Sequence, residues 1–245
     1  MNAKVIKRWV RLLHYWFGAI VSLQLLIWLG TAVYFNLTPH DELKGMSYNH
    51  SHHSQPTALK LEPERLLSAS EILALSSQRK IEQLKLISLA ANPVYLLDAK
   101  VQRYQHDCQQ QTLRHAYTGK PFVINSQLAA QLALASYMGP GQVTSIDKLA
   151  TSAEWPKQCN PMWKITMDDE LDTRIYINAV NGELVGHKNQ HTELADLMFK
   201  LHFMDYLNQG SFNNPFSWLF AIFMLLLSLS GFYWVAENLV LKRYR

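Results

Sequence analysis

Charged residues are scarce in this chain of 245 residues, where Asp, Glu, Lys and Arg make up 17% of the sequence. The scarcity is local, because residues 12–40 and 206–236 contain none of the four. Two such runs exclude a purely soluble globule. They also exclude a polytopic transporter, since two runs supply two membrane spans and leave about 165 residues between them that must fold in water.

Motifs for hydrolytic chemistry are missing as well. The sequence has no nucleophile motif, no phosphate-binding loop and no His-Glu-x-x-His zinc signature. The acidic stretch 168–172 is more simply a solvated hairpin turn than a set of catalytic carboxylates. We therefore expect no hydrolase and assign no catalytic residue.

Several histidines lie close together without forming a recognisable metal site. His50, His52 and His53 form the cluster HSHH in a polar loop, but no carboxylate or cysteine completes a ligand spacing beside it. His187 and His191 are four residues apart, as on one helical face, yet the strand pattern before them is equally compatible with a loop. We assign no metal ligand and no role to these five histidines.

The net charge of +4 does not indicate a nucleic-acid-binding surface. Seven basic residues and one acidic residue lie in residues 1–11 and 237–245, so the rest of the chain has a net charge of −2. Basic residues beside membrane spans are typical of the cytoplasmic side. Both termini are therefore predicted to be cytoplasmic, residues of roughly 40–208 are predicted to lie outside, and no nucleic acid partner is expected.

Two apolar runs are long enough to cross a bilayer. Residues 12–35 would form a helix of about 36 Å, against a hydrocarbon core of about 30 Å. The run is too long for the apolar region of a signal peptide and no small-residue cleavage site follows it, so we expect an uncleaved anchor. The second run, 216–236, is also long enough. The chain is therefore expected to contact the lipid bilayer directly.

The segment between the spans begins with helix and strand patterns. Ser68 and Glu71 form a capping-box pattern, which predicts a short helix. Strand-like runs follow between residues 81 and 104. Residues 112–124 predict a hairpin that turns at a Thr-Gly pair.

A second helix and a meander follow. Residues 127–138 are rich in Ala and Leu and predict a helix that ends at a Gly-Pro-Gly sequence. Residues 162–188 alternate at period two, which predicts a three-stranded meander. Residues 94–149 and 162–188 share an order of strands and turns, which suggests a diverged internal repeat. The predicted fold class is α+β, an antiparallel sheet with packed helices, flanked by two transmembrane α-helices.

Four stretches of the sequence resemble the PepSY-associated transmembrane family. LLHYWFGAIVSLQLLIWLGTAVYF at 12–35 resembles its first helix, and PMWKITMDDELDTRIYINAVNGELV at 161–185 resembles its PepSY strands. KLHFMDYL at 200–207 resembles the Leu-His-Phe segment before the next helix, and FSWLFAIFMLLLSLSGFYWV at 216–235 resembles that helix. Together the resemblance covers most of the chain.

The resemblance implies a protein of the inner membrane of a Gram-negative bacterium, with a PepSY region in the periplasm. Larger members have four helices, and some resemble ferric-siderophore reductases that carry b-type haem between the helices. This chain departs from that pattern by having two spans, which leaves the electron path incomplete within one copy. The partners implied are further copies of the chain in a homo-oligomer, or another membrane redox protein.

The expected organisation combines these spans with the central domain. It consists of a cytoplasmic tail at 1–11, a transmembrane helix at 12–36, a linker at 37–67, a periplasmic PepSY-like domain at 68–191, an amphipathic juxtamembrane helix at 192–209, a transmembrane helix at 210–236 and a cytoplasmic tail at 237–245.

Three histidines, His14, His202 and His40, are candidate ligands of a b-type haem. His14 lies at the cytoplasmic end of the first span and His202 on the periplasmic side, so about 30 Å of membrane should separate them. They cannot share one haem in one monomer, because a bis-His site needs two imidazoles at the same depth. His202 could pair with His40, whereas His14 would need a ligand from a second copy or another subunit. The alternative is that His14 is an interfacial residue and that His202 packs or caps an amphipathic helix.

The two cysteines, Cys108 and Cys159, both belong to the segment expected in the periplasm and lack CxxC spacing. An oxidising compartment favours a disulfide between them. The alternative is a pair of buried thiols.

Two classes of function remain. One is a redox protein that carries or accompanies haem in iron or siderophore handling, and, if catalytic, acts as a haem-dependent reductase component. The other is a non-catalytic PepSY module that binds or restrains a partner at the periplasmic face.

Overall fold

The chain folds into two compact units. The computed structural model describes residues 3–49, 61–76 and 80–240. One unit, here called the helical unit, combines Met1–Thr38 with Ala195–Arg245, and the other, here called the sheet unit, is Pro39–Leu194. The helical unit is therefore built from two pieces of sequence that are separated by the whole sheet unit.

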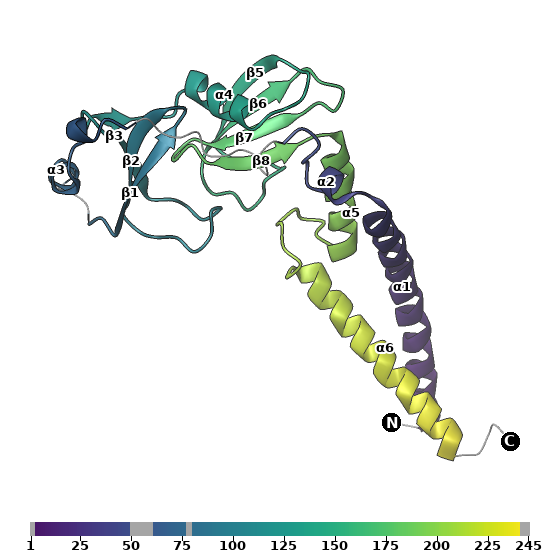
Figure 1. The fold of residues 1–245 in the computed structure, drawn as a ribbon. Coiled ribbons are helices and arrows are strands. Elements are labelled where there is room, and N and C mark those ends of the chain that lie inside the picture. Colours follow the sequence, from purple (N-terminus) through teal and green to yellow (C-terminus); the bar gives the residue numbers. More distant parts are fainter. Residues whose placement is uncertain (1–2, 50–60, 77–79, 241–245) are drawn as a thin grey trace. The chain divides into compact units, whose positions relative to one another are not determined.

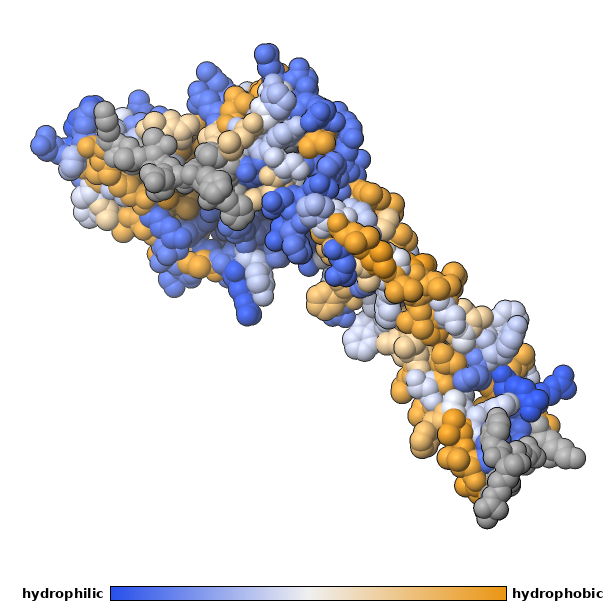
Figure 2. Space-filling view, turned by 45° about the vertical axis from the view of Figure 1, so that its right-hand side comes forward, coloured by the Kyte–Doolittle hydropathy of each residue, from blue (hydrophilic) through white to orange (hydrophobic). Residues whose placement is uncertain are grey.

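Two long helices dominate the helical unit. Helix α1 is Ala3–Leu37 and helix α6 is Pro215–Val240, and they run side by side (Figure 1). Both are long and apolar enough to cross a membrane, with mean hydropathies of 1.7 and 2.1 over an 18-residue stretch of each. Most of their large apolar side chains are exposed, and hydrophobic surface covers this part of the molecule in Figure 2. Such surface is stable in lipid rather than in water.

Helix α1 extends beyond the apolar run at its N-terminal end. Lys7 forms an ion pair with Glu237 of α6, and the guanidinium of Arg11 lies 5.1 Å from the ring centre of Trp234. These contacts join the polar ends of the two helices. Farther along, Val21, Phe220 and Met204 form a buried apolar cluster.

A third helix, α5, belongs to the helical unit from Ala195 onwards. It is Gln190–Phe203, so it ends six residues before the end of the amphipathic helix expected at 192–209. The backbone then takes positive φ angles at Met204 and Asn208, both 53°, which a continuing helix does not allow. Residues 204–214 instead form a structured turn that leads into α6.

The sheet unit contains two antiparallel four-stranded sheets, each with its strands in sequence order. The first holds β1 (Gln83–Leu89), β2 (Asn92–Asp98), β3 (Gln111–His115) and β4 (Pro121–Phe122). The second holds β5 (Val143–Leu149), β6 (Met162–Met167), β7 (Arg174–Asn178) and β8 (Leu184–Lys188). The α helices of this unit are α2 (His40–Leu43), α3 (Ala69–Ala74) and α4 (Ser126–Ala135), and a 3₁₀ turn lies at Pro63–Arg65.

The structure confirms the α+β class and several local signals. Helix α3 begins with the expected capping box, in which the Ser68 hydroxyl accepts from the Glu71 amide at 3.3 Å and the Glu71 carboxylate accepts from the Ser68 amide at 2.7 Å. Strands β6, β7 and β8 form the expected meander.

Two expectations about the strands are wrong. The strand expected to run towards residue 104 ends at Asp98, because the chain then turns back and the Ala99 amide bonds the Gln110 carbonyl at 3.0 Å. The repeat boundary 94–149 is also wrong, because it joins three strands of the first sheet to β5 of the second. The two similar halves are instead the four-strand meanders 83–122 and 143–188.

Both sheets contribute to one apolar core. Leu96 and Leu113 of the first sheet, Ile165 and Ile175 of the second and Ala129 of α4 belong to the same buried cluster. Helix α4 packs on β5, β6 and β7. The sheet unit is therefore stabilised as a single folded body.

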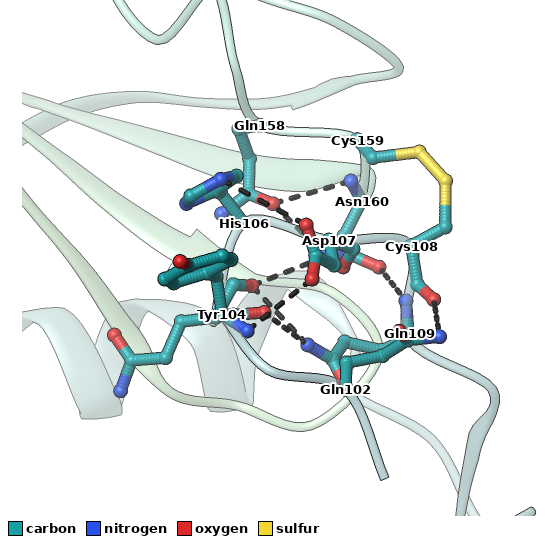
Figure 3. Close-up of polar contacts among 10 residues, drawn as sticks. Gln102, Tyr104, His106, Asp107, Cys108, Gln109, Gln158, Cys159 and Asn160 are labelled. Carbon is teal, nitrogen blue, oxygen red and sulfur yellow. Dashed lines mark hydrogen bonds and ion pairs between the residues drawn. A yellow bond between two sulfur atoms is a disulfide. The ribbon is translucent and has the colours of Figure 1, made fainter. Parts of the chain in front are cut away.

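A disulfide joins Cys108 and Cys159, with a Cα–Cα distance of 4.9 Å (Figure 3). It connects the β2–β3 loop to the β5–β6 loop, and hence one sheet to the other. The buried Asn160 reinforces the link, since its side chain accepts from the Gln109 amide and donates to the Asp107 carbonyl, both at 2.7 Å. The β2–β3 loop is therefore fixed at its C-terminal end.

Peptide mapping without reduction should recover Cys108 and Cys159 as one crosslinked pair. Closing a loop of this length stabilises the folded state by about 4 kcal/mol in the chain-entropy model, so the double variant Cys108→Ser, Cys159→Ser should melt at a lower temperature. Two thiols that alkylate freely in freshly isolated, unreduced protein would contradict the disulfide.

Candidate functional site

His202 lies near the end of α5, with its ring held against α1. Its Nδ1 atom is 2.8 Å from the Thr31 hydroxyl oxygen. That hydroxyl donates its own proton to the backbone carbonyl of Ile27 or Trp28, at 2.9 or 3.1 Å. The Thr31 oxygen must therefore accept from an Nδ1–H of His202. This tautomer leaves a lone pair on Nε2.

The surroundings of His202 are aromatic. The ring centres of Phe203, Phe35 and Trp28 lie 5.1, 5.9 and 6.0 Å from that of His202. The Trp28 indole also donates to the His202 carbonyl at 2.5 Å. A pocket of about 390 Å³ opens beside the imidazole. It is lined by Trp28, His202, Phe203, Met204, Ser217, Phe220, Ala221 and Met224.

His14 has the same kind of anchor on α6. Its Nδ1 atom is 2.8 Å from the Ser230 hydroxyl oxygen, which donates to the Leu227 carbonyl at 2.9 Å. The same reasoning places the His14 proton on Nδ1 and a lone pair on Nε2. A Cβ added at Gly231 would come within 3.4 Å of the His14 ring, so the glycine lets the imidazole lie close to α6.

The two histidines form separate sites. Thr31, which holds His202, lies 17 residues after His14 on α1, which is about 26 Å along a helix. One copy of the chain therefore does not bring His14 and His202 together. His40 is exposed at the first position of α2, in the sheet unit. The cluster of His50, His52 and His53 lies outside the described residues.

The residues around His14 and His202 fit the haem that the family resemblance implies. Haem iron binds the unprotonated nitrogen of a neutral imidazole, and ligand histidines commonly donate their other ring N–H to a fixed acceptor. Each of these rings offers Nε2, and within the described part of the chain neither Nε2 takes a hydrogen bond. Each site holds one such ring, so a haem bound there would need another ligand from elsewhere.

The described residues contain no group of three or more His, Cys, Asp or Glu side chains arranged to hold a metal ion. Asp168, Glu170 and Asp172 of the acidic turn are exposed, as expected, whereas Asp169 is buried. Its carboxylate accepts from the Tyr137 hydroxyl at 2.6 Å and from the Leu171 and Thr173 amides. Burial opposes the charge, but these bonds together hold the pKa of Asp169 below its ordinary value. Asp169 therefore stabilises the turn.

His187, to which we assigned no role, is a buried structural histidine. It is 2% exposed, and its Nε2 lies 2.9 Å from the Ser136 hydroxyl, which donates to the Ala133 carbonyl at 2.8 Å. Burial lowers the pKa of His187 to about 4, although the charge of Asp169 opposes the shift. This imidazole is therefore neutral at pH 7.

Sequence reasoning named the two membrane histidines but missed their partners. Thr31 and Ser230 are ordinary hydroxyl residues in apolar runs, and each lies far in sequence from the histidine it contacts, at separations of 171 and 216 residues. One signal was available, since a polar residue inside a spanning helix usually has a structural or functional partner. Their pairing becomes visible only when the helices are packed.

The fold and site together define a membrane protein. Its two apolar helices make buried polar contacts, and a domain of two sheets lies between them in the sequence. The family model described as the PepSY-associated TM region matches residues 11–243. The chain belongs to this family. No curated protein and no solved structure matches it.

The sheet unit should lose stability in mild acid through His187. Its folded pKa of about 4 is below the unfolded value near 6.5, so the unfolded state binds the proton first. Stability is therefore complete well above pH 6.5, falls by about 3 kcal/mol as the pH drops to 4, and stops falling through this group below about pH 3. Denaturant unfolding between pH 4 and 7 measures the slope.

Two variants isolate the contribution of His187. His187→Gln should flatten the slope between pH 4 and 6.5 even if it lowers stability at pH 7, whereas the exposed His40→Gln should keep the parent slope. An unchanged slope in His187→Gln would show that another group causes the acid sensitivity.

Proposed function

We propose that this chain is a haem-binding component of a membrane redox system that handles iron or iron chelates. The observation that carries the proposal is the matched anchoring of His14 and His202. In both cases a hydroxyl on a facing helix fixes Nδ1–H and leaves Nε2 as a lone-pair donor. Two histidines that only packed against a helix or capped it would not both need a hydroxyl partner of this kind.

His14 and His202 would each supply one imidazole nitrogen to a b-type haem, which when bound would supply one-electron chemistry. Ser230 and Thr31 would fix the tautomer and orientation of the two rings. Trp28 and Phe203 would keep water from the His202 site. These roles require only the contacts already present between the helices.

The other protein ligands of such a haem would come from outside the single chain. His14 and His202 are about 26 Å apart along α1, so neither can complete the other's site. Pairing two copies supplies one further histidine of each kind and gives four spanning helices, the number that a helix bundle needs to enclose a cofactor. We therefore propose that the active form is a homo-oligomer or a complex with another membrane redox protein.

The proposed location is the inner membrane, with both termini in the cytoplasm and the sheet unit in the periplasm. The basic residues beside both spans support it. A periplasmic reporter fused after Asn189 should be active, and a cytoplasmic reporter at the same place should be inactive. The reverse pattern would disprove this topology.

Membranes that contain the expressed protein should show the Soret and α bands of b-type haem. His14→Ala and His202→Ala should each reduce the haem content, because each removes one ligand. His106→Ala, in the β2–β3 loop, should retain the parent spectrum. Thr31→Val and Ser230→Ala should weaken haem retention by about tenfold or more, since they remove only the partner of Nδ1.

The same spectra can refute the proposal. If the parent binds no haem when haem is supplied, or if both histidine variants bind as much as the parent, the haem-binding role is wrong. The alternative, a PepSY module that binds or restrains a partner through the sheet unit, would then take its place.

A further inference from the structure

The C-terminal end of α5 has an unusual set of hydrogen bonds. The last four carbonyls of any helix lack partners within the helix. In α5 all four are bonded. Three of them accept hydrogen bonds from side chains, which belong to α1, to α6 or to the residue just before α6. The carbonyl of Lys200 accepts from the Asp205 amide at 2.9 Å, Leu201 from Gln24 Nε2 at 3.1 Å, His202 from Trp28 Nε1 at 2.5 Å, and Phe203 from Asn214 Nδ2 at 2.9 Å and Ser217 Oγ at 3.0 Å.

Water usually satisfies such carbonyls when a helix ends in solvent. Inside hydrocarbon no water is available, and each unsatisfied backbone group costs several kcal/mol. A helix that ends in lipid therefore needs a protein donor for every terminal carbonyl. Gln24, which is 93% buried in an otherwise apolar part of α1, serves this purpose for Leu201.

The positions of these donors along α1 place the end of α5 at membrane depth. Gln24 and Trp28 lie about 18 and 24 Å along the helix from Leu12, where the uncharged run begins, and the hydrocarbon core is about 30 Å thick. Both donors therefore fall inside the core.

Helix α6 leaves room for α5 at this level. Phe220, in the second turn of α6, packs on Trp28 with ring centres 5.3 Å apart. Helix α1 continues for nine residues beyond Trp28, which is about 13 Å. There it contacts α5, since Phe35 lies 4.5 Å from Phe199 between ring centres and Thr31 bonds His202. The end of α5 takes the place beside α1 that α6 does not reach.

The turn after α5 has the side-chain pattern of a lipid-facing segment. Asp205 is buried, and its carboxylate accepts from the Gln209 and Gly210 amides at 2.8 and 2.7 Å. Leu207 and Phe212 point outwards, at 59% and 72% exposed. Tyr206 is also exposed, so the outer surface of the turn is mainly apolar, although the polar Gln209 and Asn213 are exposed beside it.

We propose that the C-terminal turn of α5 and residues 204–212 form a re-entrant segment, embedded in the leaflet that holds the C-terminal end of α1. Its outer surface, formed by Leu207 and Phe212, contacts lipid acyl chains. The pocket at His202 then opens within the membrane, so a ligand reaches it through the bilayer. This inference rests on hydrogen bonds and depth alone and does not depend on haem binding.

Single cysteines can test the depth in liposomes, because the two native cysteines are joined in a disulfide. Leu207→Cys and Phe212→Cys would each be labelled with the environment-sensitive dye NBD. Leu26→Cys on α1, at 67% exposed, is the control for lipid, and Val123→Cys in the sheet unit, at 71% exposed, is the control for water.

Dye at positions 207 and 212 should be quenched by doxyl-labelled phospholipid as strongly as dye at position 26, and several-fold more than dye at position 123. Iodide in the buffer should quench it several-fold less than at position 123. If both positions instead behave like position 123 with both quenchers, the segment lies in water and the proposal is wrong.

A second measurement tests the need for a protein donor. Gln24→Met keeps the length of the side chain but leaves the Leu201 carbonyl without its partner, so the protein in liposomes should melt at a lower temperature than the parent. Ser22→Ala, an exposed position on the same helix, should melt like the parent. A Gln24→Met protein as stable as the parent would show that water reaches the carbonyl, which contradicts a membrane-embedded end. Both tests use protein without haem, so their failure would leave the proposed function standing.

Discussion

The helical unit depends on one requirement, the hydrogen bonding of the carbonyls at the end of α5. Because Gln24 and Trp28 of α1 bond two of these carbonyls, and Asn214 and Ser217 bond another, the end of α5 is tied to both spanning helices. Those bonds fix the depth of α5 and the direction of its last turn. The His202 side chain is placed by the same set of contacts. The same contacts therefore bond the terminal carbonyls of α5 and set the geometry of the candidate site.

The two membrane histidines show how helix packing can set the chemistry of a side chain. Neither Thr31 nor Ser230 carries charge, yet each already donates its proton to a backbone carbonyl within its own helix and can offer the histidine only an oxygen. The choice of tautomer is thus made by helix geometry, before any ligand binds. Moving α6 along α1 by one residue would separate His14 from Ser230, so the register of the helices and the state of the ring are coupled.

Local signals in the sequence were sufficient for much of the fold. The Ser68–Glu71 box, the period-two strands of 162–188 and the uncharged runs each depend on neighbouring residues, and each prediction of an element was correct. Strand β5 was anticipated only as the end of the repeat 94–149 and was grouped with the wrong sheet, because its apolar residues fall at 143, 146 and 149 and a register shift interrupts its pairing with β6. The histidines of the candidate site could be named from the spans, whereas their hydroxyl partners and the end of α5 depend on contacts across more than 170 residues. No local pattern specifies those contacts.

The division of the helical unit into two pieces of sequence also affects its biosynthesis. Helix α1 is made first, and the 156 residues of the sheet unit are made before the end of α5 and the whole of α6. At a synthesis rate of about 5–20 residues per second, roughly 8–30 s pass before these partners are made. During that time His14 lacks Ser230, Gln24 lacks the α5 carbonyl and Thr31 lacks His202. Three polar side chains are then left in a lone apolar helix, where protein contacts from the insertion machinery or from another membrane helix would have to stabilise them until synthesis is complete.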